Sequence, residues 1–233
     1  MNLRTQLILA TALTLLAATS PSQAQFVAYE NLGTPATAGY SEPNVNLPVF
    51  GDSLNLLAGG TVSTVGLSLF NSSSGGNTGS ILTGTTLLSF YDNTAPYGGG
   101  ILALSNPLIG TAILSWDFTA GGGLPAGFYS TATFDLTPLS ILVPPHILLT
   151  QQFTETTGTS TRNGVVLFSN PTIGTSPSTV YIKSTATAEG LYTFTGNAGQ
   201  FGYHIELTLV PEPSSLALLG VGAAAMLIFR RRK

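Results

Sequence analysis

The central part of the chain alternates apolar side chains with Ser and Thr over short stretches separated by Gly and Pro. The clearest stretch is residues 128–136. One face of it carries Phe128, Ser130, Ala132, Phe134 and Leu136, and the other carries Tyr129, Thr131, Thr133 and Asp135. Because successive side chains of a strand point to opposite faces of a sheet, this period of two indicates a half-buried β-strand.

The same reasoning predicts about nine to eleven strands along the chain. They are expected at residues 26–30, 61–70, 86–91, 109–118, 128–136, 146–154, 164–168, 180–183, 191–194 and 203–209. No segment between the two ends shows the period of about 3.6 residues that marks an amphipathic helix. The predicted fold class is therefore all-β: an antiparallel β-sandwich with a jelly-roll-like topology, occupying residues 25–209.

Three irregular stretches carry separate expectations. Residues 31–48 are rich in Pro and Gly and predict a loop. Residues 71–80, NSSSGGNTGS, predict a flexible low-complexity loop. Gly66 interrupts the alternation of residues 61–70 and predicts a β-bulge there.

Residues 1–24 have the pattern of a secretory signal peptide. Arg4 supplies the positive start, residues 7–18 form a short apolar run, and Ser22 and Ala24 place small residues at the two positions that a signal peptidase reads. We expect cleavage after Ala24. An uncleaved N-terminal anchor is the weaker alternative, because the apolar run is too short to span a bilayer comfortably.

Residues 210–233 combine three segments, VPEP, an apolar run and RRRK. Pro211, Glu212 and Pro213 favour an extended and accessible chain, since proline fixes φ and disfavours helix at the preceding residue. Residues 214–229 predict a transmembrane helix of roughly 24 Å, slightly shorter than the hydrocarbon core of about 30 Å. The basic tail of Arg230, Arg231, Arg232 and Lys233 would hold this end in the cytoplasm and retain the chain in the membrane.

This order of tripeptide, span and basic tail resembles the PEP-CTERM sorting domain of Gram-negative bacteria. The resemblance implies an exported protein whose Pro211, Glu212 and Pro213 are recognised by an exosortase-type membrane enzyme. It also implies delivery from an inner-membrane-anchored precursor to the cell surface or extracellular matrix, often together with exopolysaccharide. An ordinary C-terminal single-span anchor is the alternative. Neither interpretation describes the activity of the central domain.

The charge of the central domain disfavours binding to nucleic acid. Residues 25–209 contain two cations, Arg162 and Lys183, against nine carboxylates, whereas nucleic-acid binding needs clustered Lys and Arg. The chain has no cysteine, so neither disulfides nor thiol chemistry contribute. The fold must depend on core packing and backbone pairing.

Candidate chemistry is sparse, and no catalytic residue, metal ligand or cofactor is predicted. His146 and His204 are the only histidines, and each is interpreted as a solvent-facing strand residue. A Ser-His-Asp site would converge only in the fold, but no Gly-x-Ser-x-Gly motif supports one. Calcium is a further alternative, with oxygen ligands drawn from Asp92, Asn93, Asp117, Asp135 and Glu155.

Three functions of different classes remain at this point. The first is a non-enzymatic structural or adhesive surface protein, which the low charge and the absence of catalytic motifs favour. The second is a carbohydrate-binding module for exopolysaccharide, with a sugar-stacking platform drawn from Trp116, Tyr91, Tyr97 and Tyr129. The third is a hydrolase, which would need a histidine close to a carboxylate and a serine. The expected partners are a signal peptidase, the exosortase, membrane lipid before processing and exopolysaccharide.

Overall fold

The computed structural model describes residues 24–33, 36–94, 106–177, 179–185, 187, 190–193 and 200–209. One compact unit spans Gln25–Thr208, and only this unit is described below. The predicted transmembrane helix at residues 214–229 lies outside the described residues, as does the predicted signal peptide apart from Ala24.

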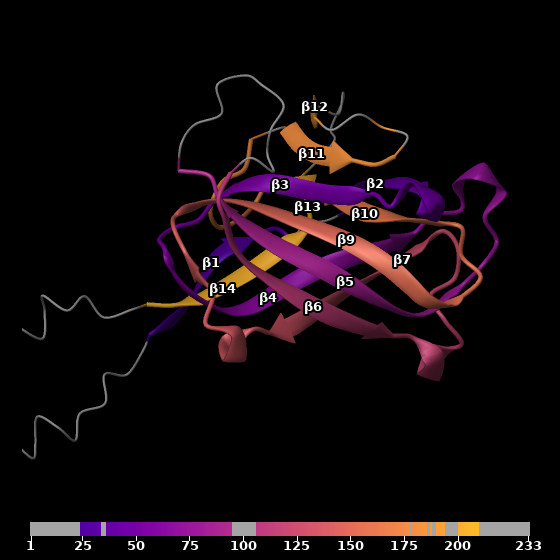
Figure 1. Ribbon diagram of the computed structural model, residues 1–233, viewed down its shortest axis with the longest axis horizontal. Coiled ribbons are helices and arrows are strands. Elements are labelled where there is room, and N and C mark those ends of the chain that lie inside the picture. The colour runs from indigo at the N-terminus through magenta and orange to yellow at the C-terminus, as the bar shows by residue number, and fades with distance from the viewer. Residues whose placement is uncertain are drawn as a thin grey trace, which may run out of the picture. The chain divides into compact units, whose positions relative to one another are not determined.

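The described residues form strands, turns and short 3₁₀ helices, with no α-helix among them (Figure 1). In chain order the strands are β1 (Gln25–Glu30), β2 (Ala36–Pro43), β3 (Val49–Asn55), β4 (Gly60–Asn71), β5 (Ile81–Asp92), β6 (Leu108–Asp117), β7 (Phe128–Asp135), β8 (Leu142–Val143), β9 (His146–Gly158), β10 (Arg162–Phe168), β11 (Thr179–Lys183), β12 (Gly190–Thr193), β13 (Gln200–Phe201) and β14 (Tyr203–Thr208).

The strands form two sheets, and all of their pairings are antiparallel. The first sheet has the order β1-β14-β4-β10-β13, with β2 added to β10 and with β7 and β8 added to β4. The second sheet has the order β12-β11-β3-β9-β5-β6. The prediction of an all-β fold built from antiparallel sheets is therefore confirmed, and the arrangement is consistent with a β-sandwich.

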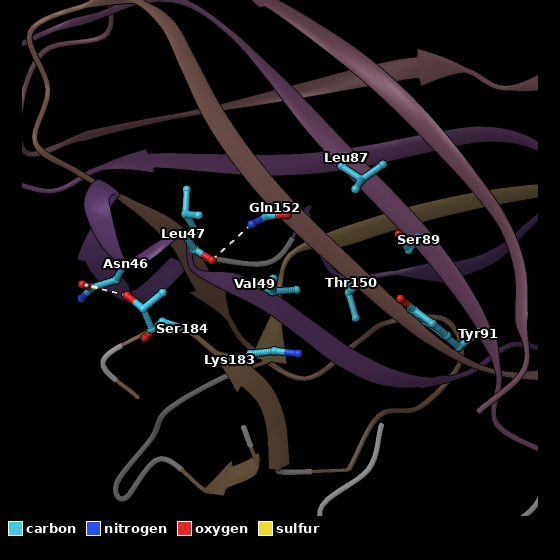
Figure 2. Close-up of a pocket in the computed structure, with 11 residues that line it drawn as sticks. Asn46, Leu47, Val49, Leu87, Ser89, Tyr91, Thr150, Gln152, Lys183 and Ser184 are labelled. Atoms are coloured by element: carbon cyan, nitrogen blue, oxygen red, sulfur yellow. Dashed lines mark hydrogen bonds between the residues drawn. The ribbon is translucent and has the colours of Figure 1, made fainter. Parts of the chain in front are cut away.

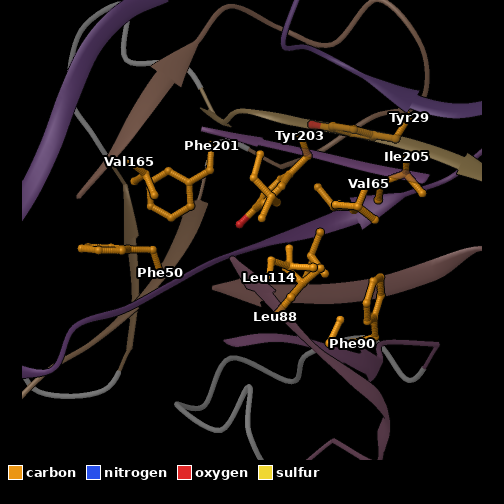
Figure 3. Close-up of a cluster of buried hydrophobic side chains, with 14 of the residues drawn as sticks. Tyr29, Phe50, Val65, Leu88, Phe90, Leu114, Val165, Phe201, Tyr203 and Ile205 are labelled. Carbon is orange, nitrogen blue, oxygen red and sulfur yellow. The ribbon is translucent and has the colours of Figure 1, made fainter. Parts of the chain in front are cut away.

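Apolar side chains from both sheets meet in one core (Figure 3). The Phe50 ring of β3 meets the Phe201 ring of β13 edge to face, with their centroids 6.1 Å apart. Trp116 of β6 contacts Phe134 of β7 in the same way at 5.3 Å. Each of these ring pairs joins one sheet to the other, so burial of the two inner faces holds the domain together.

Two predictions about local structure were wrong, and one strand was missed. Residues 31–48 are not a loop throughout, because β2 pairs with β10 along its whole length. Gly164 permits this close pairing, since a Cβ there would collide with the carbonyl of Tyr40. The strand β3 was not predicted at all. Gly66 forms no bulge, because it pairs regularly with His204 and Thr133. The irregularity of β4 lies instead at Ser63, which is skipped where Thr64 and Val62 pair with Glu206 and Leu207.

The predicted loop at residues 71–80 is confirmed, but buried asparagines anchor it. Asn71 is fully buried, and its Nδ2 donates to the carbonyls of Gly79 at 2.9 Å and Leu124 at 2.7 Å. Asn77 Nδ2 donates to Asn71 Oδ1 at 2.9 Å, and Asn77 Oδ1 accepts from the amide of Thr161 at 3.2 Å. These side chains replace the backbone pairing that the segment lacks, so its composition misrepresents its order.

Asp52 is a buried carboxyl within the apolar core. It lies between Phe50 and Leu54 on the inward face of β3, and none of its surface is exposed. Burial raises its pKa well above the usual range, although the Ser176 hydroxyl, which donates to Asp52 Oδ1 at 2.7 Å, acts in the opposite direction. No described cation is among the groups that act on it. Ionised Asp52 would therefore be costly to the fold.

We predict that Asn77→Ala lowers the free energy of unfolding by about 1 to 3 kcal/mol, because it leaves buried partners without a hydrogen bond. Urea denaturation of the full chain measures this loss. The matched control is Thr78→Ala at the exposed neighbouring position, which should leave stability close to wild type. Equal stabilities for the two variants would show that the asparagine network does not order residues 71–80.

We predict that the stability of the wild-type chain falls as pH rises from 4 to 8. A raised folded pKa gives a stability contribution that is present below the unfolded pKa of about 3.9 and lost as pH rises through the folded pKa. The Asp52→Asn variant should lack this loss, since its amide stays neutral. Urea denaturation at several pH values measures both profiles.

The exposed Asp117 provides the control for this titration. Its pKa is lowered by the side chain and amide of Thr119, so its stability contribution is present above the unfolded pKa and is lost as pH falls. Asp117→Asn should therefore retain the wild-type decline between pH 4 and 8. Matching profiles for wild type and Asp52→Asn would contradict the account of Asp52.

Candidate functional site

A cavity of about 400 Å³ opens on the face of the second sheet that points away from the core (Figure 2). We call it the outer-face cavity. It is lined by side chains of β3, β5, β9 and β11 and by two short segments beside them, namely Asn46, Leu47, Val49, Leu87, Ser89, Tyr91, Thr150, Gln152, Lys183, Ser184 and Thr185.

Strand alternation places these side chains together. In β9, Leu149 and Phe153 face the core. Thr150 and Gln152 occupy the alternate positions and therefore face outward, where they line the cavity. The register pairs Thr150 with Ser89 and Gln152 with both Leu87 and Val49. The cavity floor is therefore a block of cross-strand neighbours from three adjacent strands.

A small apolar cluster separate from the main core lies under one side of the cavity. Leu148 and Tyr181 are buried in it, and Val49 and Tyr91 pack against them. Tyr91 thus has two contacts: part of its half-buried side chain packs on the cluster, and part lines the cavity. Figure 2 shows the Val49 side chain beside Lys183, with Thr150 between these two and Tyr91.

Hydrogen bonds fix the opposite rim of the cavity. Leu47 has a left-handed backbone with φ 45°, and its carbonyl accepts from Gln152 Nε2 at 3.2 Å. The amide of Thr185 donates to the carbonyl of Asn46 at 2.8 Å, and the Thr185 hydroxyl donates to Asn46 Oδ1 at 3.4 Å. The rim is consequently attached both to β9 and to the segment after β11.

The four candidate aromatic residues do not form one platform. Trp116 is buried in the core, 4% exposed, and its Nε1 donates to Thr86 Oγ1 at 2.8 Å. Tyr129 lies on β7 of the first sheet, where it meets Phe168 edge to face. Tyr97 lies outside the described residues. Trp116 takes no part in a platform, because core packing takes its ring, and Tyr91 alone of the described candidates lines the outer-face cavity.

The two histidines lie in different surroundings. His146 is exposed, as predicted, and its Nδ1 lies 2.8 Å from Asn55 Oδ1. His204 is half-buried between two carboxylates: its Nδ1 contacts Glu30 Oε2, and its Nε2 lies 3.3 Å from Glu206 Oε1. Sequence reasoning did not predict this carboxylate pair, which depends on the pairing of β1 with β14. Neither histidine has a hydrogen bond to a serine among the described contacts.

The carboxylates considered as calcium ligands have other local roles. Asp92, Asp117 and Asp135 each end a strand and accept the amide of the threonine two residues later, at 2.8, 2.9 and 2.9 Å. The threonine side chain and amide lower the pKa of all three carboxyls. These are Asx turns, which the repeated Asp-x-Thr spacing indicates in the sequence.

Glu155 lies apart from these three aspartates. It lines a second cavity of about 360 Å³, and burial raises its pKa. Within the described ranges, no group of three or more His, Asp or Glu side chains is placed to hold a metal ion.

The residues predicted to direct sorting lie outside the described part of the chain, except Ala24, which is exposed. They are Pro211, Glu212 and Pro213 of the tripeptide and Arg230, Arg231, Arg232 and Lys233 of the basic tail. A search of the described residues for helices that are long and apolar enough to cross a membrane finds none.

Comparison with solved structures gives only remote similarity. A structure of infectious bursal disease virus, Gx strain, matches with 10% identity and a TM-score of 0.23, covering 82% of this chain and 35% of that chain. The VP2 subviral particle of the same virus matches with 12% identity and a TM-score of 0.23, covering 83% and 40%. The chain therefore spans less than half the length of these proteins. No curated protein matches the chain.

The C-terminal segment has a specific match. Residues 209–233 match the family model described as the PEP-CTERM protein-sorting motif. This range contains the Pro-Glu-Pro tripeptide, the apolar run and the basic tail on which the resemblance was based. The resemblance is confirmed, and residues 209–233 carry a PEP-CTERM protein-sorting motif.

Proposed function

We propose that this chain is an exported, exosortase-sorted protein whose β domain acts at the cell surface or in the extracellular matrix. The observation that carries the proposal is the PEP-CTERM motif at residues 209–233, which implies a secreted protein that a membrane enzyme processes. In this proposal Pro211, Glu212 and Pro213 are recognised by the exosortase. The apolar run and the residues Arg230, Arg231, Arg232 and Lys233 hold the precursor in the inner membrane until processing.

The N-terminal pattern supports the export step. Arg4, the apolar run at residues 7–18 and the small residues before Ala24 are the features that a signal peptidase requires. The pairing of β1 with β14 is relevant here, because it makes Gln25 and Thr208 register partners at the edge of the first sheet. Both segments proposed for processing are consequently attached to neighbouring strand ends, where neither cut would remove a residue of the sheets.

A jelly-roll sandwich is the scaffold that the pairings support. Four strands of the first sheet follow the order β1-β14-β4-β7, and four of the second follow β3-β9-β5-β6. The chain visits these eight strands by passing repeatedly between the sheets, as two interlocked Greek keys require. Of the remaining strands, β11 and β12 extend the second sheet beyond β3, while β8 and β10 pair with the two ends of β4.

A non-catalytic structural or adhesive role is proposed for the domain. Its support comes from the surroundings of the candidate catalytic groups: His146 contacts an asparagine, His204 contacts two carboxylates, and the three strand-end aspartates cap turns. Hydrolysis by a serine would need a histidine that contacts both a serine and a carboxylate. Exopolysaccharide is the proposed neighbour of the domain outside the cell.

We predict that Glu212→Ala blocks sorting, because it removes the only charged group of the tripeptide. Most of the variant should remain in the membrane fraction at precursor mass, while wild type accumulates at the cell surface. Cell fractionation followed by immunoblotting measures the distribution. Ser214→Ala, one residue beyond the tripeptide, is the matched control and should be sorted normally. Normal surface delivery of Glu212→Ala would contradict recognition at this tripeptide.

A further inference from the structure

The outer-face cavity has the dimensions and the lining of a small polar ligand site. Its volume of about 400 Å³ falls within the range of roughly 300 to 1,000 Å³ typical of small-molecule sites. Three apolar side chains, Leu47, Val49 and Leu87, line it together with one aromatic ring, Tyr91. The other lining side chains are hydroxyls, amides and one ammonium, and no carboxylate is among them.

This combination matches the surface of a sugar ring. A pyranose has faces made of C–H groups, which pack on an aromatic or aliphatic surface, and a rim of hydroxyls, which both donate and accept hydrogen bonds. The Tyr91 ring and the Val49 side chain supply the apolar surface, while Ser89, Thr150 and Gln152 supply groups of both hydrogen-bonding types. Among the described lining residues no carboxylate offers a metal ion a strong ligand or supplies the acid and base pair of glycoside cleavage.

The cavity is held in shape by the fold. Its floor consists of register pairs of β3, β9 and β5, and its rim is bonded to β9 through the Leu47 carbonyl and Gln152 Nε2. Thr150 and Ser89 are 3% and 6% exposed, so these two lining residues lie at the bottom of the cavity and not at its mouth. A site on adjacent paired strands needs little ordering when a ligand binds, which favours affinity for a small ligand.

We infer that the outer-face cavity binds a single hexose unit of a polysaccharide, with Tyr91 packing on the sugar ring and Thr150 bonding its hydroxyls. The inference rests on the proposed function, because only an exported domain meets extracellular polysaccharide. Beyond the proposed function, the ligand is a hexose and the residues that bind it are Tyr91 and Thr150. This site takes the place of the four-residue aromatic platform, which the burial of Trp116 excludes.

Saturation-transfer NMR tests the inference on the purified full chain in a detergent without sugar groups. The probes are free glucose, galactose, mannose and N-acetylglucosamine, one at a time. The wild-type chain should transfer saturation to at least one of them. Leu87→Trp, which fills the cavity from an exposed position, should weaken binding of that sugar by about tenfold or more.

Ile113→Trp is the matched control for this variant. Ile113 is the register partner of Leu87 on β6, is 75% exposed and does not line the cavity. It should bind sugar within about twofold of wild type. If thermal melting shows that Leu87→Trp is unstable, Thr150→Val provides a second test. This variant keeps the shape of the side chain and removes its hydroxyl, so it should bind sugar about fivefold more weakly than wild type.

Two results would overturn the inference: no transfer to any of the four sugars, or equal binding by Leu87→Trp, Thr150→Val and wild type. Surface delivery of the same variants is measured in parallel. A chain that reaches the surface but binds no sugar removes the sugar site alone. A chain that binds sugar but stays in the membrane removes the proposed sorting and keeps the site.

Discussion

Contact between the apolar inner faces of two sheets is the interaction on which the rest of this domain depends. The chain has no cysteine, and its central part offers only Arg162 and Lys183 to pair with nine carboxylates, so disulfides are absent and ion pairs are few. Ring contacts such as Phe50 with Phe201 and Trp116 with Phe134 join the sheets. The same core contains the buried carboxyl of Asp52, whose ionisation opposes folding.

Because the inner faces carry the stability, the outer faces and the loops are left for other roles. The outer-face cavity uses side chains that alternate with core residues along β9 and β5, so it can be altered without changing the core. The loop ends are fixed by short side chains. Asp-x-Thr turns end three strands, and buried asparagines anchor residues 71–80.

The sequence predicts strands well where their alternation is regular. The half-buried pattern of β7 follows directly from the alternation in residues 128–136. Prediction failed for β3, whose inward row contains Asp52 between Phe50 and Leu54, and for β2, which has few apolar side chains and depends on pairing with β10. In both cases tertiary contacts outweigh the local signal.

The candidate site was less predictable than the strands. Tyr91, Gln152 and Lys183 come from β5, β9 and β11, so only the sheet order brings them together. Composition likewise did not reveal that buried asparagines anchor the loop at residues 71–80, because it does not show which side chains are buried. The sorting motif was predictable because its three parts are contiguous in the sequence.

The central claim is that the chain is cut at its C-terminal motif and delivered outside the membrane. Its most direct test is the intact mass of the wild-type protein recovered from the surface fraction, in cells with and without the exosortase. The account predicts a mature protein that begins after Ala24 and lacks the apolar run and basic tail, and it predicts that this C-terminal loss disappears without the enzyme. A surface protein of full C-terminal mass in both strains, or a cytosolic protein with both ends intact, would contradict it.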